Sequence, residues 1–154
     1  MLKILLKLTI LLSFVSLAVP QYTRDYFVVT ARLSCKIQEK HNFRYRIQYF
    51  ETDIFTSDDK VTKFDNVGNG TDGEVMDNNF GIMFGDGFLN NLYELYAVIL
   101  HGCTILPKKM RRLRVEMESC STLKRNCRQN IRLDITEQGE EVPEIVIPDV
   151  TFSS

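Results

Sequence analysis

Four cysteines are the residues of this chain whose chemistry is most evident from type and number. They are Cys35, Cys103, Cys120 and Cys127. An even number of cysteines in an oxidising compartment predicts disulfide bonds, and four cysteines permit three pairings between which spacing alone does not choose. The alternative is a structural zinc site, which needs closely spaced ligand pairs. The cysteine spacings are wide and irregular and the chain has two histidines, so disulfides are favoured over zinc.

The two histidines, His41 and His101, are the candidates for acid–base chemistry. His41 falls in a polar stretch between two predicted strands, where a solvated loop residue is expected. His101 ends an apolar run beside Cys103, which favours a hydrogen-bonded structural histidine over a catalytic one.

No motif of a known catalytic centre accompanies these histidines. The sequence lacks a Gly-x-Ser-x-Gly elbow, a His-Glu-x-x-His pair and a glycine-rich phosphate loop. Glu137, Glu140 and Glu141 surround Gly139 in a predicted hairpin turn, whereas acid–base catalysis needs a carboxyl whose pKa is tuned in a desolvated pocket. The sequence therefore predicts a protein that is not an enzyme and that holds neither a metal nor a cofactor.

The densest cluster of positive charge lies between residues 108 and 114, where five of seven side chains are basic. The candidate binding residues are Lys108, Lys109, Arg111, Arg112 and Arg114. Such a segment matches an acidic receptor or an anionic lipid surface, although a solvated strand face explains the same pattern. The sequon Asn69-Gly70-Thr71 predicts one N-linked glycan, because it lies among glycines in a predicted exposed turn.

The elements that must position these residues are predominantly β-strands, because apolar and polar side chains alternate with a period of two. The expected strands cover residues 27–35, 43–49, 80–84, 95–100, 112–118, 131–135 and 145–147. The run at 95–100 is continuously apolar, which indicates a strand buried on both faces. About seven short strands predict an all-β, two-layer antiparallel sandwich. Residues 52–73 are expected to form an acidic irregular region, which is the second candidate binding region.

The N-terminus predicts a secretory signal peptide. Lys3 and Lys7 flank an apolar run that ends near Ser16 and Ala18, so we expect cleavage after Ala18. Residues 1–18 are then the signal peptide and residues 19–154 a single domain, extracellular and not membrane-spanning, because the run is too short for a spanning helix. Losing the two lysines lowers the formal charge from −1 to about −3, which argues against nucleic acid as a partner.

Several motifs, taken in order, resemble the nematode transthyretin-like family. The first strand ends in Leu33-Ser-Cys35 and a later strand ends in His101-Gly-Cys103. Between and after them the matching motifs are Glu51-Thr-Asp53, Asp58-Asp59, Thr71-Asp72-Gly73-Glu74 and Cys127-Arg128. Ala31, Val75 and Leu95 stand where the family has Gly, Phe and Pro, and Cys120 is an additional cysteine, so the chain resembles a divergent member.

The resemblance implies a secreted sandwich of the transthyretin fold. It also implies that Cys35 pairs with Cys103, since the family places the strands that they end close together, and that Cys120 and Cys127 bridge a short loop. The expected function is non-catalytic binding to an extracellular receptor or an anionic lipid or cell surface. One alternative is a carrier of a small apolar ligand such as a lipid, retinoid or hormone, lined by aromatic residues of the second strand (Phe43, Tyr45, Tyr49 and Phe50).

The less favoured alternative is 5-hydroxyisourate hydrolase, which shares the transthyretin fold. That enzyme uses histidines, an arginine and a C-terminal Tyr-Arg-Gly-Ser, whereas this sequence ends in Thr151-Phe-Ser-Ser154. The residues that would build its pocket are therefore not expected here.

Overall fold

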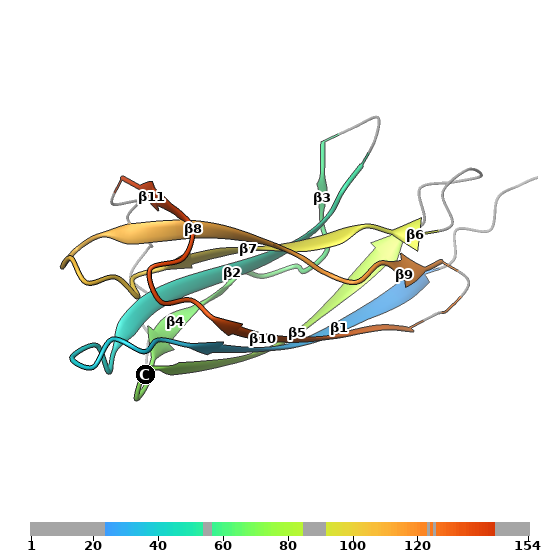
Figure 1. The fold of residues 1–154 in the computed structure, drawn as a ribbon. Coiled ribbons are helices and arrows are strands. Elements are labelled where there is room, and N and C mark those ends of the chain that lie inside the picture. The colour runs from blue at the N-terminus through green and yellow to red at the C-terminus, as the bar shows by residue number, and fades with distance from the viewer. Residues whose placement is uncertain (1–23, 54–56, 85–91, 123, 125, 144–154) are drawn as a thin grey trace, which may run out of the picture.

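The computed structural model describes residues 24–53, 57–84, 92–122, 124 and 126–143. These residues form eleven β-strands and no helix (Figure 1). The strands are β1 (Arg24–Ser34), β2 (Phe43–Glu51), β3 (Asp59–Lys60), β4 (Asn66–Gly70), β5 (Glu74–Phe84), β6 (Leu92–Tyr93), β7 (Leu95–His101), β8 (Met110–Glu116), β9 (Cys120–Ser121), β10 (Asn126–Asp134) and β11 (Glu140–Val142).

The strands are divided between two main sheets. One sheet has three strands in the order β10-β1-β5, and the other has the order β11-β8-β7-β2-β3, with β4 also paired to β2. A short pair, β6 with β9, stands apart. Figure 1 shows the three-stranded sheet as a lower layer beneath β2, β7 and β8.

The two sheets share one apolar core because each long strand turns alternate side chains inward. On β1 the inward residues Phe27, Val29 and Leu33 are essentially inaccessible, and Ile47 and Ile99 meet them from β2 and β7. Full burial of each such side chain contributes roughly 1.5–3 kcal/mol. The alternation in the sequence thus produces a two-layer all-β structure.

One carboxyl group lies inside this core. Asp77 on β5 is fully buried, accepts a hydrogen bond of 2.5 Å from the hydroxyl of Tyr49, and accepts another from the side-chain amide of Asn66. Burial raises the pKa of Asp77 because the charged form loses its hydration. The two donors satisfy both carboxyl oxygens and link β2, β4 and β5.

The long predicted strands are confirmed. β1, β2 and β7 occupy the segments where the sequence alternates or is continuously apolar, and every residue of β7 is buried. The strand predicted at 112–118 is β8, which begins and ends two residues earlier, and the strand predicted at 131–135 is only the second half of β10. The predicted strand at 80–84 is the end of the longer β5. The predicted strand at 145–147, the signal peptide at 1–18 and the cleavage after Ala18 lie outside the described residues.

Three expectations about the fold were wrong in part. The described residues contain eleven strands where about seven were expected, and the pairing of β1 with β10 is parallel. Residues 52–73, expected to be irregular, include β3 and β4. Strands of two to five residues have too few positions to show an alternation, and alternation carries no information about strand direction.

The expected hairpin around Gly139 is also wrong, since β10 and β11 belong to different sheets. The connection crosses from β10 in the lower layer to β11 at the edge of the upper one. It turns at Gly139, whose φ is 85°, and a Cβ there would lie 2.4 Å from the carbonyl oxygen of Arg112. Glycine therefore allows the crossover to pass close to β8.

Both disulfides implied by the family resemblance are present. Cys35 at the end of β1 is bonded to Cys103 just after β7, and Cys120 is bonded to Cys127. The first bond joins the two sheets, and the second closes a local loop between β9 and β10. Among the described residues there is no free cysteine.

The two disulfides should differ in their contribution to stability. Replacing Cys35 and Cys103 with Ala frees a loop with a sequence separation of 68, whereas Cys120 and Cys127 are separated by 7. Loop-closure entropy predicts losses of about 4 and about 2 kcal/mol in the free energy of unfolding. Urea unfolding of the two double variants measures both losses. An equal or reversed order would show that the entropic account fails here.

Asn69 lies on β4 opposite Arg44, with an exposed side chain, so the sequon is on an accessible strand instead of in the expected turn. Expression of the full chain, residues 1–154, in a eukaryotic host should attach one glycan at Asn69. Asn69→Gln should therefore increase gel mobility by the mass of one glycan and leave secretion intact. Identical mobility of the two proteins would show that the sequon is skipped.

Candidate functional site

The candidate site is the end of the molecule where the loop between β7 and β8, residues 102–109, lies beside the loop between β1 and β2, residues 35–42. We call these two loops the tip. Figure 1 shows both loops at the left-hand end of the molecule, beyond the ends of the sheets. The Cys35–Cys103 disulfide joins them at their base, so both loops start from one fixed point.

The β7–β8 loop is held in shape by its own hydrogen bonds. The buried hydroxyl of Thr104 donates to the carbonyl oxygen of Leu106 at 2.7 Å, and the backbone N–H of Thr104 donates to Gly102 at 2.9 Å. Lys108 has a φ of 61°, in the left-handed region, which turns the chain back toward β8. The loop is therefore a compact, cross-linked turn.

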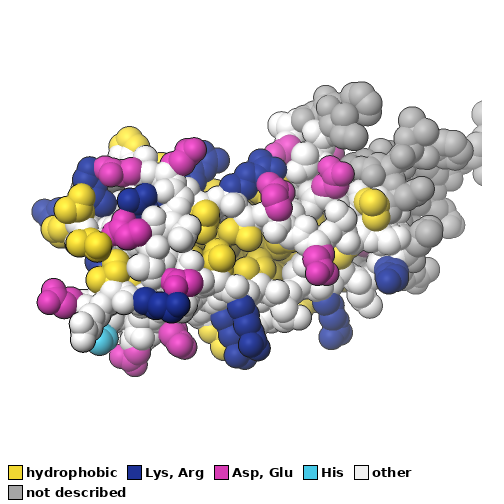
Figure 2. Space-filling view, in the orientation of Figure 1, with side chains coloured by type: hydrophobic (Ala, Val, Ile, Leu, Met, Phe, Trp, Pro, Cys, Tyr) yellow, Lys and Arg dark blue, Asp and Glu magenta, His cyan; other side chains and the backbone are white. Residues whose placement is uncertain are grey.

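This loop exposes two aliphatic side chains. Ile105 is 74% exposed and Leu106 is 59% exposed. A neighbouring hollow of about 480 Å³ is lined by residues 37–40, Ile105, Pro107 and Lys108. Figure 2 shows hydrophobic side chains at the left-hand end of the molecule with Lys and Arg side chains beside them.

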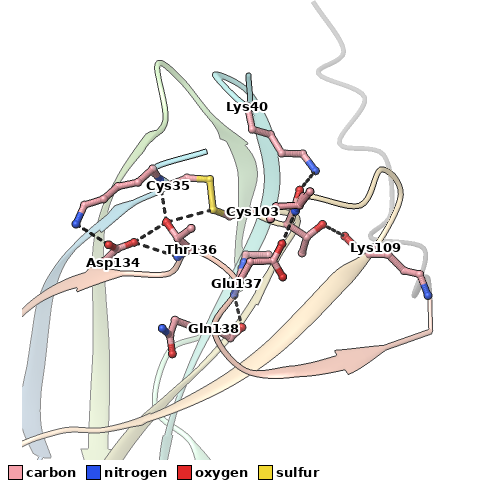
Figure 3. Close-up of a disulfide and its surroundings, with 12 residues drawn as sticks. Cys35, Lys40, Cys103, Lys109, Asp134, Thr136, Glu137 and Gln138 are labelled. Atoms are coloured by element: carbon pink, nitrogen blue, oxygen red, sulfur yellow. Dashed lines mark hydrogen bonds and ion pairs between the residues drawn. A yellow bond between two sulfur atoms is a disulfide. The ribbon is translucent and has the colours of Figure 1, made fainter. Parts of the chain in front are cut away.

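Lysines surround the exposed pair. The ammonium group of Lys40 donates to the carbonyl oxygen of Thr104 at 2.5 Å, which holds its charge against the β7–β8 loop (Figure 3). Lys108 is exposed and Lys109 forms an ion pair with Glu141. Lys36, at the start of the other loop, forms an ion pair of 2.7 Å with Asp134 that lowers the pKa of Asp134 to about 2.

The crossover from β10 to β11 holds the β7–β8 loop in place through contacts of Glu137. The Glu137 carboxylate accepts a hydrogen bond from the backbone N–H of Ile105 and pairs with Arg111 at 2.8 Å. The bond from Ile105 lowers the pKa of Glu137, and the charge of Arg111 adds to this effect. The backbone N–H of Glu137 also donates to the carbonyl oxygen of Cys103 at 3.2 Å. The carboxylate thus remains charged and fixes the loop.

His101 is buried beneath this crossover and hydrogen-bonded, as the sequence predicted for a structural histidine. Its side chain is fully buried, and its Nε2 lies 3.1 Å from the carbonyl oxygen of Gln138, so Nε2 carries the proton and donates. Its Nδ1 has no hydrogen-bond partner. Burial lowers the pKa of His101 to about 4, and the nearby charge of Arg111 acts in the same direction. The imidazole is neutral at physiological pH, whereas His41 is exposed.

The five basic residues identified in the sequence do not form one free cluster. Arg111 points into the end of the sandwich, where it pairs with Glu137 and donates to the carbonyl oxygen of Gly139 at 2.8 Å. Arg114 pairs with Glu116 at 2.6 Å and lies 3.6 Å above the ring of Tyr96. Among the residues that the structure describes, only Lys108 and Arg112 of the five lack an ion pair.

Sequence reasoning missed the apolar half of the tip. Ile105 and Leu106 stand in a segment that has no alternation to predict their exposure, and Lys40 is distant in sequence. The available signal was the order Ile105-Leu106-Pro107 followed by two lysines, because proline ends strand pairing and leaves an apolar pair in a basic turn.

The aromatic residues considered for a carrier site serve mainly as packing. Phe43, Tyr45 and Tyr49 belong to the buried core. Phe50 faces the other side of its sheet, where its ring stacks on Tyr96 with centroids 5.3 Å apart.

The described segments contain no helix long and apolar enough to cross a membrane. The same segments hold no group of three or more His, Cys, Asp or Glu residues placed to bind a metal ion.

The described residues form an all-β protein with two disulfide bonds, of the kind typical of extracellular proteins. No family model, no curated protein and no solved structure matches this chain at a significant level.

The buried His101 should make stability depend on pH. Between about pH 6.5 and 4 the unfolded chain binds a proton at this residue and the folded protein does not, so the free energy of unfolding falls as the pH falls, by up to about 3 kcal/mol. His101→Gln keeps an N–H donor for Gln138 but does not titrate. Chemical unfolding at pH 7 and 4.5 should show a smaller loss for this variant than for wild type or His41→Gln. Equal losses in all three would contradict the assignment.

Proposed function

We propose that this protein is a secreted, non-catalytic binding protein of the transthyretin-like family that docks onto an anionic lipid surface through its tip. The order of the family's motifs and the Cys35–Cys103 bond support the family assignment. The two disulfides support an extracellular location, because such bonds persist in oxidising compartments.

The observation that carries the docking proposal is the exposure of Ile105 and Leu106 on a cross-linked loop. Transfer of such side chains from water to the acyl boundary of a membrane contributes roughly 1.5–3 kcal/mol each. A flexible loop would lose part of this gain to ordering, whereas the bonds of Thr104 and Glu137 already hold this loop.

Charge supplies the second component of membrane attachment. Lys40 and Lys108 flank the hollow beside Ile105, and Arg112 on β8 is exposed. A basic side chain near an anionic bilayer contributes about 1 kcal/mol. Stable attachment needs two such signals, one apolar and one basic, and the tip provides both within two adjacent loops.

The geometry around His101 favours a binding role over a catalytic one. Its one protonated nitrogen is used by Gln138, and the crossover separates it from solvent. A general acid or base must reach its substrate and titrate near the working pH, and this imidazole does neither.

The apolar pair can be tested with vesicles of phosphatidylcholine containing 30% phosphatidylserine, a composition chosen for the experiment. Ile105→Ser with Leu106→Ser should weaken cosedimentation at least tenfold, because the apolar contribution is removed. Phe64→Ser is the matched control, since Phe64 is 71% exposed and lies in the region 52–73, away from the tip. Loss of binding in the control with retention in the tip variant would place the site in that region and sink the proposal.

The charged component has a separate test. Lys108→Glu with Arg112→Glu should abolish binding to the same vesicles at low salt, because the attraction to the anionic headgroups becomes repulsion. Weak binding to pure phosphatidylcholine should not change. Both residues lack an ion pair among the described residues, so the changes break no such contact of the fold. Reversing Lys63 and Lys124, two exposed lysines elsewhere, controls for net charge. Equal loss in both double variants would mean that attraction is general and not located at the tip.

A further inference from the structure

A second surface stands apart from the tip. The three-stranded sheet packs only its inner side chains into the core, and the alternate side chains of β10, β1 and β5 face away from it. We call this side the outer face. In the view of Figure 2, Lys and Arg side chains project from the lower border, along which β1 and β10 run in Figure 1, with Asp and Glu side chains beside them toward the left.

Strand register arranges the outer face in rows of three side chains. Residues opposite one another on neighbouring strands point the same way. The rows in order along β1 are Asn126–Tyr26–Ile82, Arg128–Val28–Phe80, Asn130–Thr30–Asn78 and Arg132–Arg32–Met76. None of these twelve side chains is a carboxylate. The next row, Asp134–Ser34–Glu74, carries two carboxylates, of which Asp134 is paired with Lys36.

One half of the outer face is apolar and aromatic. Phe80 is 53% exposed and Tyr26 is 43% exposed, and their rings stack with centroids 5.7 Å apart. Val28 and Ile82 stand beside them and are also exposed. A contiguous apolar patch of this kind on a folded domain usually marks a binding surface.

The cations of the outer face lie along β10 and in the row Arg132–Arg32–Met76. Arg32, Arg128 and Arg132 are exposed, and none of them pairs with a carboxylate among the described residues. Arg46 and Arg111, by contrast, are fixed by Asp65 and Glu137. The guanidinium groups of the outer face are therefore available for an external anion.

A hollow lies at the cationic end of this face. Its volume is about 880 Å³ and it opens widely to solvent. Three consecutive residues of each strand line it (residues 32–34, 74–76 and 132–134), together with Tyr45, Asn69 and Thr71. The lining therefore also contains the carboxylates of Glu74 and Asp134, and the charge of Asp134 is neutralised by Lys36. Two of the three free arginines, Arg32 and Arg132, are in this lining.

We propose that the outer face binds a linear anionic polysaccharide, a chain of sugar rings bearing sulfate or carboxylate groups. Guanidinium groups match such oxyanions with two parallel hydrogen bonds. The C–H faces of sugar rings pack against exposed aromatic rings, which the Tyr26–Phe80 pair supplies. Alternating charged and ring-stacking contacts along one strip fit a ligand that alternates anionic groups and rings.

The shape of the outer face favours an extended chain over a globular partner. Strands lie about 4.8 Å apart and residues on one face repeat every ~7 Å, so the four rows form a strip roughly twice as long as it is wide. A stable protein interface covers about 800 Å² on each partner, which such a strip does not offer. A second copy of this face offers the same small area, so the same argument disfavours a dimer formed through it.

The proposal is tested by the affinity for a size-defined heparin oligosaccharide, measured by calorimetry in an Asn69→Gln background so that no glycan covers the hollow. Arg32→Ser with Arg132→Ser should weaken binding at least tenfold, and Tyr26→Ser with Phe80→Ser at least threefold at a salt concentration that screens charge. The matched control, Lys63→Ser with Lys124→Ser, removes two cations elsewhere and should change the affinity less than twofold. Cooperative thermal unfolding confirms that each variant is folded.

Three outcomes would overturn the proposal. They are equal weakening by the arginine pair and the lysine control, loss of binding only when Lys108 and Arg112 of the tip are replaced by Ser, and binding of polyglutamate as tight as binding of heparin. The first would show general attraction, the second a site at the tip, and the third recognition of an acidic polypeptide.

Discussion

The Cys35–Cys103 disulfide is the constraint on which the shape of the tip depends. Cys35 follows β1 of one sheet, and Cys103 stands two residues after the end of β7 in the other sheet. The bond therefore fixes the distance between the two sheets at the point where the β1–β2 and β7–β8 loops begin. Thr136, on the crossover, accepts a hydrogen bond of 2.8 Å from the backbone of Lys36, the residue after Cys35, and Glu137 donates to Cys103. The bond, the crossover and the two loops therefore form one cross-linked unit.

The cations discussed above fall into two groups, those with an ion-pair partner and those without one among the described residues. Arg111 neutralises the carboxylate that holds the β7–β8 loop, and Arg114 is occupied by Glu116 and the ring of Tyr96. Lys108 and Arg112, with the arginines of the outer face, have no such partner among the described residues. Cations that already stabilise the fold lose part of that stabilisation if they bind something else, so the cations of the second group are the ones that can bind an external anion at the lower cost.

The sequence predicted the long strands because each carries four or more inward side chains, enough for a period of two to be distinct from chance. It did not predict β3, β4, β6, β9 and β11, which have too few residues for any period. It identified five basic residues as candidates for binding, and the structure places three of them, Lys109, Arg111 and Arg114, in ion pairs. Arg111 turned inward because it stands one residue before Arg112 on the same strand, and alternation sends neighbours to opposite faces.

By itself the sequence determined that this is an all-β chain with disulfide bonds, since side-chain periodicity and the number of cysteines are properties of the chain. Only the tertiary structure decided which strands are neighbours. The parallel pairing of β1 with β10 joins residues about a hundred positions apart, and it places Arg132 beside Arg32 and Arg128 beside Val28. Both surfaces, the tip and the outer face, consist of residues brought together from separate segments. Such surfaces cannot be recognised in the linear order, because contacts between distant segments are set by the packing of the whole core.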